Sequence, residues 1–163
     1  MPLGGGGGGG GGTAQTNFVN FHASSTTALG SANQTWYESF QLPFKLTFGH
    51  ISVNIGVADA GNFHDVGIYD MTGALKADIG PTHWPSTGVQ RFANVQGNVT
   101  LNAGVYLFAW TSQGTTATLS FTNQQDSWSG VRTLAGASGG QLQSSITAPV
   151  SALDVICWYF ILD

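Results

Sequence analysis

Short runs in which apolar and polar residues alternate dominate the chain and predict β-strands. In the clearest run, residues 50–57, every second residue is Ile or Val. Alternation of this kind is typical of an antiparallel strand with one buried face. The predicted apolar face consists of Ile51, Val53, Ile55 and Val57. The next residues, Asp59-Ala60-Gly61-Asn62, are types that tolerate positive φ, so we expect a turn there.

A second pattern predicts a hairpin. The run 65–69 leads into Asp70-Met71-Thr72-Gly73, and residues 74–77 lead out of it. Asp at the first position and Gly at the fourth favour a type I turn between two antiparallel strands.

A third pattern predicts a central strand. Residues 99–101 precede the turn residues 102–104, and residues 105–110 are apolar nearly throughout, which is typical of a strand buried on both faces. Residues 116–121 alternate again, and we expect them to pair with this strand as its next antiparallel neighbour.

The remaining patterns complete an all-β picture. Residues 17–21 and 35–42 have β-type composition, residues 136–140 have loop composition, and the apolar run 155–162, which contains the single cysteine, Cys157, predicts an inner strand that closes the sheet. We expect the Cys157 thiol to be buried. No window of 11 or more residues shows an apolar period near 3.6. We therefore predict an antiparallel, jelly-roll-like β-sandwich over residues 17–163.

Nine consecutive glycines precede this domain. They are Gly4, Gly5, Gly6, Gly7, Gly8, Gly9, Gly10, Gly11 and Gly12. Glycine has no side chain to bury, so the run cannot form a core, but it permits close packing between chains. It lacks the Lys-Ser/Thr ending of a phosphate-binding loop. We predict that residues 1–16 form an attachment or oligomerisation arm.

Composition narrows the range of partners. Charged residues make up 7% of the chain, against about 25% in an ordinary soluble domain. The surface must therefore be rich in hydroxyl and amide groups, which suit self-association and sugar ligands. The net charge is −4 and the four basic residues are widely spaced, which argues against nucleic acid. No signal-like segment or membrane-length apolar run is present, so we expect neither secretion nor membrane insertion.

Three segments, 67–73, 99–110 and 139–147, resemble a β-sandwich module that recurs in bacteriophage tail-fibre and other virion proteins. In those modules a Leu-x-Ala-Gly-x-Tyr turn opens a long central strand, and a Gly-Gly-x-Leu segment precedes a short apolar terminal strand. Both occur here in that order within residues 50–163, with Gln143 where the modules usually carry proline. The resemblance implies a virion structural or host-attachment protein, commonly homotrimeric.

The loop over residues 80–88 is the main candidate for ligand binding. Trp84 stands between prolines and outside any strand pattern, which predicts an exposed, rigid indole that could stack on a sugar. His83 and Thr82 would be its hydrogen-bonding neighbours. The alternative is that Trp84 folds back to plug the sandwich or packs against another subunit. Further aromatic candidates are Trp36, Tyr37 and Trp128, whereas Trp110 and Trp158 are expected in the core.

Catalytic and metal sites find little support. His64 and Asp65 could form part of a catalytic pair with Ser52 or Ser86, but no Gly-x-Ser-x-Gly elbow is present. The histidines His22, His50, His64 and His83 lack the short spacings of a zinc site. The carboxylates Asp59, Asp65, Asp70 and Asp78 could supply oxygen ligands for calcium, yet no Asp-x-Asp-x-Asp loop occurs. We expect no enzyme activity and no cofactor.

These observations favour a bacteriophage virion protein of the tail-fibre, receptor-binding or capsid-decoration type. It would assemble in the host cytoplasm, associate with itself as a homotrimer and with other virion proteins, and display a sandwich that binds host surface glycans. A stand-alone carbohydrate-binding module is the alternative, and a hydrolase on a jelly-roll scaffold is a third hypothesis.

Overall fold

The computed structural model describes residues 18–20, 25–28, 32–122, 132–135, 139–147, 157–158 and 160–163. These residues form β-strands joined by turns and contain no helix, so the all-β prediction is confirmed. The strands are β1 (Phe18–Asn20), β2 (Ser25–Ala28), β3 (Gln34–Leu42), β4 (Leu46–Phe48), β5 (His50–Val57), β6 (Asp59–Asp70), β7 (Leu75–Asp78), β8 (Thr82–Trp84), β9 (Gly88–Ala93), β10 (Val99–Leu101), β11 (Gly104–Ser112), β12 (Thr118–Thr122), β13 (Arg132–Ala135), β14 (Cys157–Trp158) and β15 (Phe160–Leu162).

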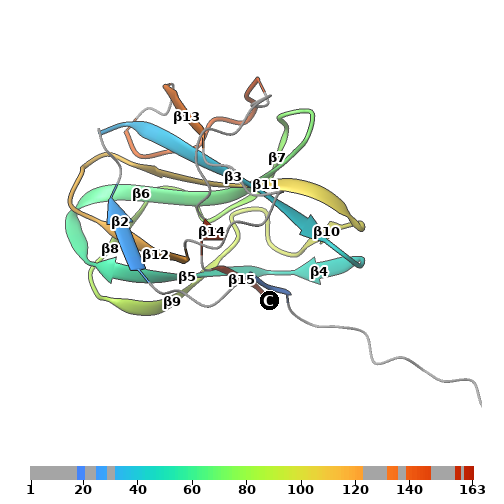
Figure 1. Ribbon diagram of the computed structural model, residues 1–163, viewed down its shortest axis with the longest axis horizontal. Helices are drawn as coiled ribbons and strands as arrows, with labels where there is room; N and C mark the ends of the chain where they lie inside the picture. Colours follow the sequence, from blue (N-terminus) through green and yellow to red (C-terminus); the bar gives the residue numbers. More distant parts are fainter. Residues whose placement is uncertain are drawn as a thin grey trace, which may run out of the picture.

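The strands form two main antiparallel sheets that face each other as a sandwich (Figure 1). One sheet has the order β13-β3-β11-β6-β7, with β8 also paired to β6. The other has the order β1-β15-β5-β12-β14, with β2 paired to β12 and β9 paired to β5. A separate two-stranded ribbon joins β10 to β4. Whether the connections amount to a jelly roll stays a prediction.

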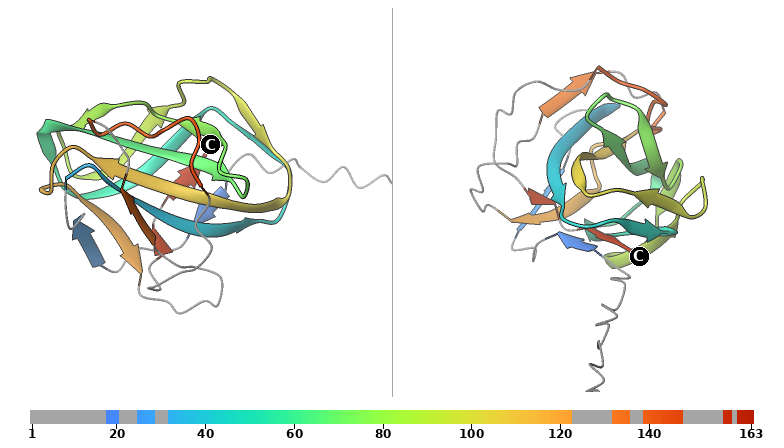
Figure 2. Two further views of the ribbon diagram at one scale, coloured as in Figure 1. Left: turned by 90° about the horizontal axis from the view of Figure 1, so that it is seen from above. Right: turned by 90° about the vertical axis from the view of Figure 1, so that its right-hand side faces the viewer.

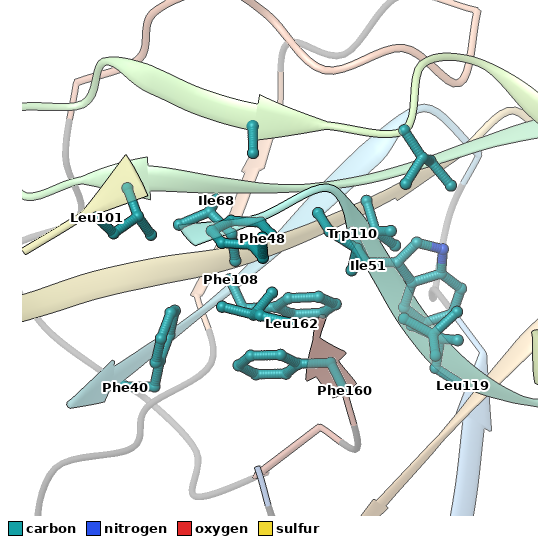
Figure 3. Packing of buried hydrophobic residues seen from close by; sticks show 14 of the residues in the cluster. Phe40, Phe48, Ile51, Ile68, Leu101, Phe108, Trp110, Leu119, Phe160 and Leu162 are labelled. Atoms are coloured by element: carbon teal, nitrogen blue, oxygen red, sulfur yellow. The ribbon is translucent and has the colours of Figure 1, made fainter. Parts of the chain in front are cut away.

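The core lies between the two sheets. Phe108 of β11 and Phe160 of β15 lie close together in this core (Figure 3). Their rings stack face to face, with centroids 4.4 Å apart and planes 4° apart. Phe40 of β3 meets Phe160 edge-on at 5.0 Å. Figure 2 shows the strands from two further directions. The core cluster contains residues of both sheets. The two sheets thus bury each other's apolar faces. This removal of apolar surface from water is the main favourable contribution to folding.

Strand β5 begins and ends where its alternation predicts. Ile51, Val53 and Ile55 are buried in the core, as expected. Val57 is exposed, and β9 no longer pairs with β5 beyond Ile55. Ser52 is buried on the predicted polar face, where its cross-strand neighbours are Arg91 of β9 and Ile161 of β15.

The expected pairing of residues 116–121 with the central strand is wrong. β11 is the predicted central strand, and its buried stretch is continuous from Leu107 to Ser112. Its two edges are occupied by β3 and β6. β12 lies in the opposite sheet, where it pairs with β2, β5 and β14. The segment between β11 and β12 therefore crosses from one sheet to the other.

The hairpin agrees with prediction, and the terminal strand agrees in part. β15 lies between β1 and β5 and is an inner strand, whereas β14, also within the predicted strand 155–162, pairs with β12 at the end of the strand order. In the β6–β7 hairpin, Gly73 N donates to Asp70 O at 2.9 Å, and Gly73 has a φ of 88°, which favours glycine. The Asp70 carboxylate accepts hydrogen bonds from Thr72 N and Ala74 N. Lys76 lies 2.7 Å from it, and these contacts hold the Asp70 pKa far below its usual range.

Residues 139–147 form a strap across the outer face of β6 and β7. Leu142 is buried against Tyr37, Tyr69 and Leu107 in a second apolar cluster. The Tyr69 hydroxyl donates to Gln143 O at 2.6 Å, and Ile146 N donates to Gly73 O at 2.8 Å. The strap therefore satisfies polar groups on the hairpin and covers an apolar face that would otherwise meet water.

Gly140 fixes one end of the strap, and its replacement is expected to be costly. A Cβ atom at Gly140 would lie 2.2 Å from Phe63 O, and the residue has a φ of 70°. Gly139 has a similar φ of 64° but open space around its Cβ position. We expect Gly139→Ala to lower the free energy of unfolding by about 1 kcal/mol through backbone strain alone, and Gly140→Ala by about 2–4 kcal/mol. Urea denaturation of both variants measures the difference, and equal losses would contradict the strap geometry.

Several predictions from the sequence lie outside the described residues. These concern the glycine arm over residues 1–16, His22, Trp128, and the side chains of Cys157 and Trp158. In the described part of the chain, no helix is long and apolar enough to cross a membrane.

Candidate functional site

Residues 59–62 do not form the predicted turn between strands; they open β6 as a wide bulge. Asp59 pairs with Trp84 and His64 with Thr82, so five steps along β6 match two steps along β8. The Asp59 carboxylate holds the bulge by accepting hydrogen bonds from Gly61 N at 3.1 Å, Asn62 N at 3.2 Å and Asn62 Nδ2 at 2.9 Å. The residues have the turn chemistry that the sequence predicts, but pairing with β8 keeps the chain extended.

The Asp59 carboxylate is ionised at neutral pH. Burial opposes its ionisation, but hydrogen bonds from Asn62 and Gly61 and the nearby His64 ring outweigh this, and the Asp59 pKa is lowered. The Asp59 carboxylate therefore places a negative charge in the bulge, and its oxygens point at neighbouring hydrogen-bond donors.

The prediction that Trp84 is an exposed indole is wrong. Trp84 is the last residue of β8 and is 0% exposed. Its ring stacks on His64 at 4.5 Å and on Trp110 at 6.0 Å, with interplanar angles of 22° and 20°. The alternative, in which Trp84 folds back to plug the sandwich, is confirmed. Trp84 pairs with Asp59 across the bulge, so the register of β8 directs the indole inward.

His64 and Asp65 do not meet as a catalytic pair. They are successive residues of β6, whose side chains point to opposite faces of the sheet. Both are fully buried. His64 Nε2 donates to Asp59 O at 3.3 Å, and burial lowers the His64 pKa. Asp65 Oδ2 accepts from Leu142 N of the strap at 3.0 Å, and burial raises the Asp65 pKa to about 7.

An exposed pair of rings lies on the outer side of the bulge. Phe63 is 39% exposed, and the exposed His83 ring lies against it in a tilted arrangement, with centroids 4.2 Å apart and planes 30° apart. The two residues come from β6 and β8. His83 alternates with the buried Trp84, so the register that buries the indole turns the imidazole outward.

Two polar side chains, Asn62 and Gln113, flank this ring pair, and hydrogen bonds hold both of them and the His83 ring. His83 Nδ1 lies 3.1 Å from Asn62 O, and Asn62 Nδ2 lies 2.9 Å from Asp59 Oδ2. Gln113 Oε1 accepts from Phe63 N at 3.3 Å, and Gln113 N donates to Phe63 O at 2.8 Å. We call Asn62, Phe63, His83 and Gln113 the ring-pair patch. The arrangement is pre-organised, because each polar side chain is anchored before any ligand arrives.

The sequence analysis identified His83 but missed the rest of the patch. Thr82, the other predicted neighbour, is half-buried and pairs with His64. Phe63 gave a weak signal, as a large apolar residue between Asn62 and His64 where the neighbours are polar. Gln113 gave none, because it reaches the patch from the end of β11, 50 residues later in the chain.

The remaining candidates do not join this patch. Tyr37 is buried, and Trp36 packs edge-on against the core residue Trp110 at 6.3 Å. Among the described residues, no three His, Cys, Asp or Glu side chains are grouped to hold a metal ion. Asp59 holds the bulge, Asp65 faces the strap with the charge of Asp78 near it, and Asp70 caps the hairpin, so the four predicted carboxylates do not gather at one site.

Comparison of the chain with protein-family models, curated proteins and solved structures finds no match. Its function therefore has to be argued from its own residues.

Proposed function

We propose that the chain is a bacteriophage virion structural protein, of the fibre, receptor-binding or capsid-decoration type, that contacts the host surface through the ring-pair patch. The observation that carries this proposal is the exposed Phe63–His83 ring pair at the bulge of β6. Exposed aromatic rings with anchored polar neighbours are suited to glycans, whose pyranose rings have apolar faces and polar edges.

The low charge of the chain supports the same proposal. A surface of hydroxyl and amide groups, with 7% charged residues, suits contacts with neighbouring subunits and with sugars. A single small patch supplies weak affinity. Homotrimeric display would multiply such contacts and raise the overall affinity by avidity.

Phe63→Ala tests the patch directly. Loss of the exposed ring is expected to cost about 1–2 kcal/mol per site, or roughly 5–30-fold in affinity for host cells. Val89→Ala is the matched control, because Val89 is 53% exposed on β9 and lies outside the patch. Binding of the fluorescently labelled protein to host cells measures both variants.

Equal binding by Phe63→Ala and the unchanged protein would show that the patch is not the contact with the host surface.

Mass measurement under native conditions separates the two leading functions. A stable monomer that binds glycans would favour the stand-alone carbohydrate-binding module over a virion oligomer. Electron microscopy of the virion would then locate the protein on the head or the tail.

A further inference from the structure

We infer that the ring-pair patch binds a neutral pyranose and discriminates against acidic sugars. This inference rests on the proposed function, since it assigns a ligand class to the same patch. It follows from which atoms of the patch are donors, which are acceptors, and where the nearby charges lie.

The hydrogen-bond partners determine the orientation of all three polar side chains. Asn62 O can only accept, so the imidazole proton lies on His83 Nδ1, and in that tautomer Nε2 is the acceptor. The ionised Asp59 carboxylate can only accept, so the Asn62 NH2 group faces it. Phe63 N can only donate, so the Gln113 carbonyl faces it.

The remaining polar atom of each side chain is available to a ligand. His83 Nε2, Asn62 Oδ1 and Gln113 Nε2 make no hydrogen bond with any residue that the structure describes. The patch therefore offers two acceptors and one donor around an aromatic surface. A ligand that fits must donate at least two hydrogen bonds and accept one.

Sugar hydroxyls meet this requirement, because each can both donate and accept. An ionised carboxylate, sulfate or phosphate only accepts, so it would leave His83 Nε2 and Asn62 Oδ1 without partners. Leaving polar atoms unpaired at a contact is unfavourable. The donor and acceptor pattern thus favours a neutral polyhydroxylated ring over an acidic one.

The charges near the patch act in the same direction. The Asp59 carboxylate lies directly behind Asn62. The cations of β7 and β9 are committed elsewhere, Lys76 to Asp70 at 2.7 Å and Arg91 to Asp163 at 2.8 Å. The Lys76–Asp70 pair is also far from the patch. Asp70 is seven residues from Phe63 along β6, which corresponds to roughly 23 Å of strand. An acidic sugar at the patch would meet the negative charge of Asp59, while Lys76 and Arg91 are already paired with other carboxylates.

A glycan array of neutral oligosaccharides and their sialylated, uronic-acid and sulfated counterparts tests the ligand class. We expect bound glycans to be neutral and each acidic counterpart to bind at least about tenfold more weakly. Stronger or equal binding of acidic glycans that is lost in Phe63→Ala would overturn the inference and leave the proposed function standing. Host-cell binding that depends on Phe63, together with no binding to any neutral glycan, would also overturn it. Host-cell binding that does not depend on Phe63 would instead overturn the proposed function.

Gln113→Glu tests the donor and acceptor pattern within the patch. The variant retains an oxygen to accept from Phe63 N, but it replaces the Gln113 NH2 donor with a further acceptor. We expect about tenfold weaker binding of the best neutral glycan from the array, with an unchanged urea midpoint as evidence of intact folding. The control Gln90→Glu makes the same chemical change on β9, outside the patch, and should leave binding unchanged. Unchanged binding by Gln113→Glu would overturn the assignment of Gln113 as a ligand donor.

Discussion

Trp84→Ala is expected to lower the free energy of unfolding by about 3–5 kcal/mol, the range for removing a large buried aromatic side chain. The indole has no exposed surface and stacks on His64 and Trp110. Its removal leaves a cavity between β8 and the central strand β11. Urea denaturation followed by circular dichroism measures the loss, and a fall in the melting temperature should accompany it.

Two further variants keep this test decisive. Trp84→Phe retains a ring in the stack and should lose less stability than Trp84→Ala. Phe63→Ala, at the exposed ring pair, should change stability by less than about 1 kcal/mol while weakening binding. If Trp84→Ala were as stable as the unchanged protein but failed to bind glycans, the indole would be a ligand contact and its buried position would be wrong.

Asp65→Asn is expected to remove a large part of the pH dependence of stability. The Asp65 carboxyl is fully buried beneath the strap, and burial raises its pKa to about 7. Hydrogen bonds from the backbone of Leu142 and Gly80 only partly offset this effect, and the negative charge of Asp78 adds to it. The difference from the ordinary value of 3.8 corresponds to roughly 4 kcal/mol between the two protonation states.

The direction of the pH dependence follows from the number of protons that the folded and the unfolded chain bind. Between pH 4 and pH 7 the folded protein retains the Asp65 proton while the unfolded chain has lost it. The contribution of Asp65 to the free energy of unfolding is therefore fully present below about pH 4 and is lost as the pH rises towards 7. Asn keeps an acceptor for Leu142 N but does not titrate, so the variant should gain stability relative to the unchanged protein as the pH rises.

Urea denaturation at several values between pH 4 and pH 8 measures this difference. Asp70→Asn is the control of opposite sign, because Lys76 and Thr72 lower the pKa of Asp70. Its contribution is present at neutral pH and is lost as the pH falls through the acid range, so this variant should lose stability at neutral pH. An Asp65→Asn variant whose stability stays parallel to that of the unchanged protein across this range would contradict the buried, protonated carboxyl.

The sequence by itself determined the features that depend on neighbours along the chain. The alternation in residues 50–57 predicts β5, and Asp70 and Gly73 predict the β6–β7 hairpin, because strand period and turn chemistry are local properties. The all-β class follows from the same local signals repeated along the chain. His83 was identified as a site candidate for a local reason as well, its place beside Trp84 between two prolines.

Only the tertiary structure decided which strands pair and which side of each strand meets the core. β3 and β6 occupy both edges of β11, so β12 joins the opposite sheet. The alternation in residues 116–121 predicts a strand but does not indicate which sheet it joins. The bulge at Asp59 sets the register of β8, which buries Trp84 and exposes Phe63 and His83. Gln113 reaches the same patch from a distant part of the chain. Residue types and their spacing determine local backbone geometry. The burial and contacts of a side chain depend on pairings between segments far apart in the sequence.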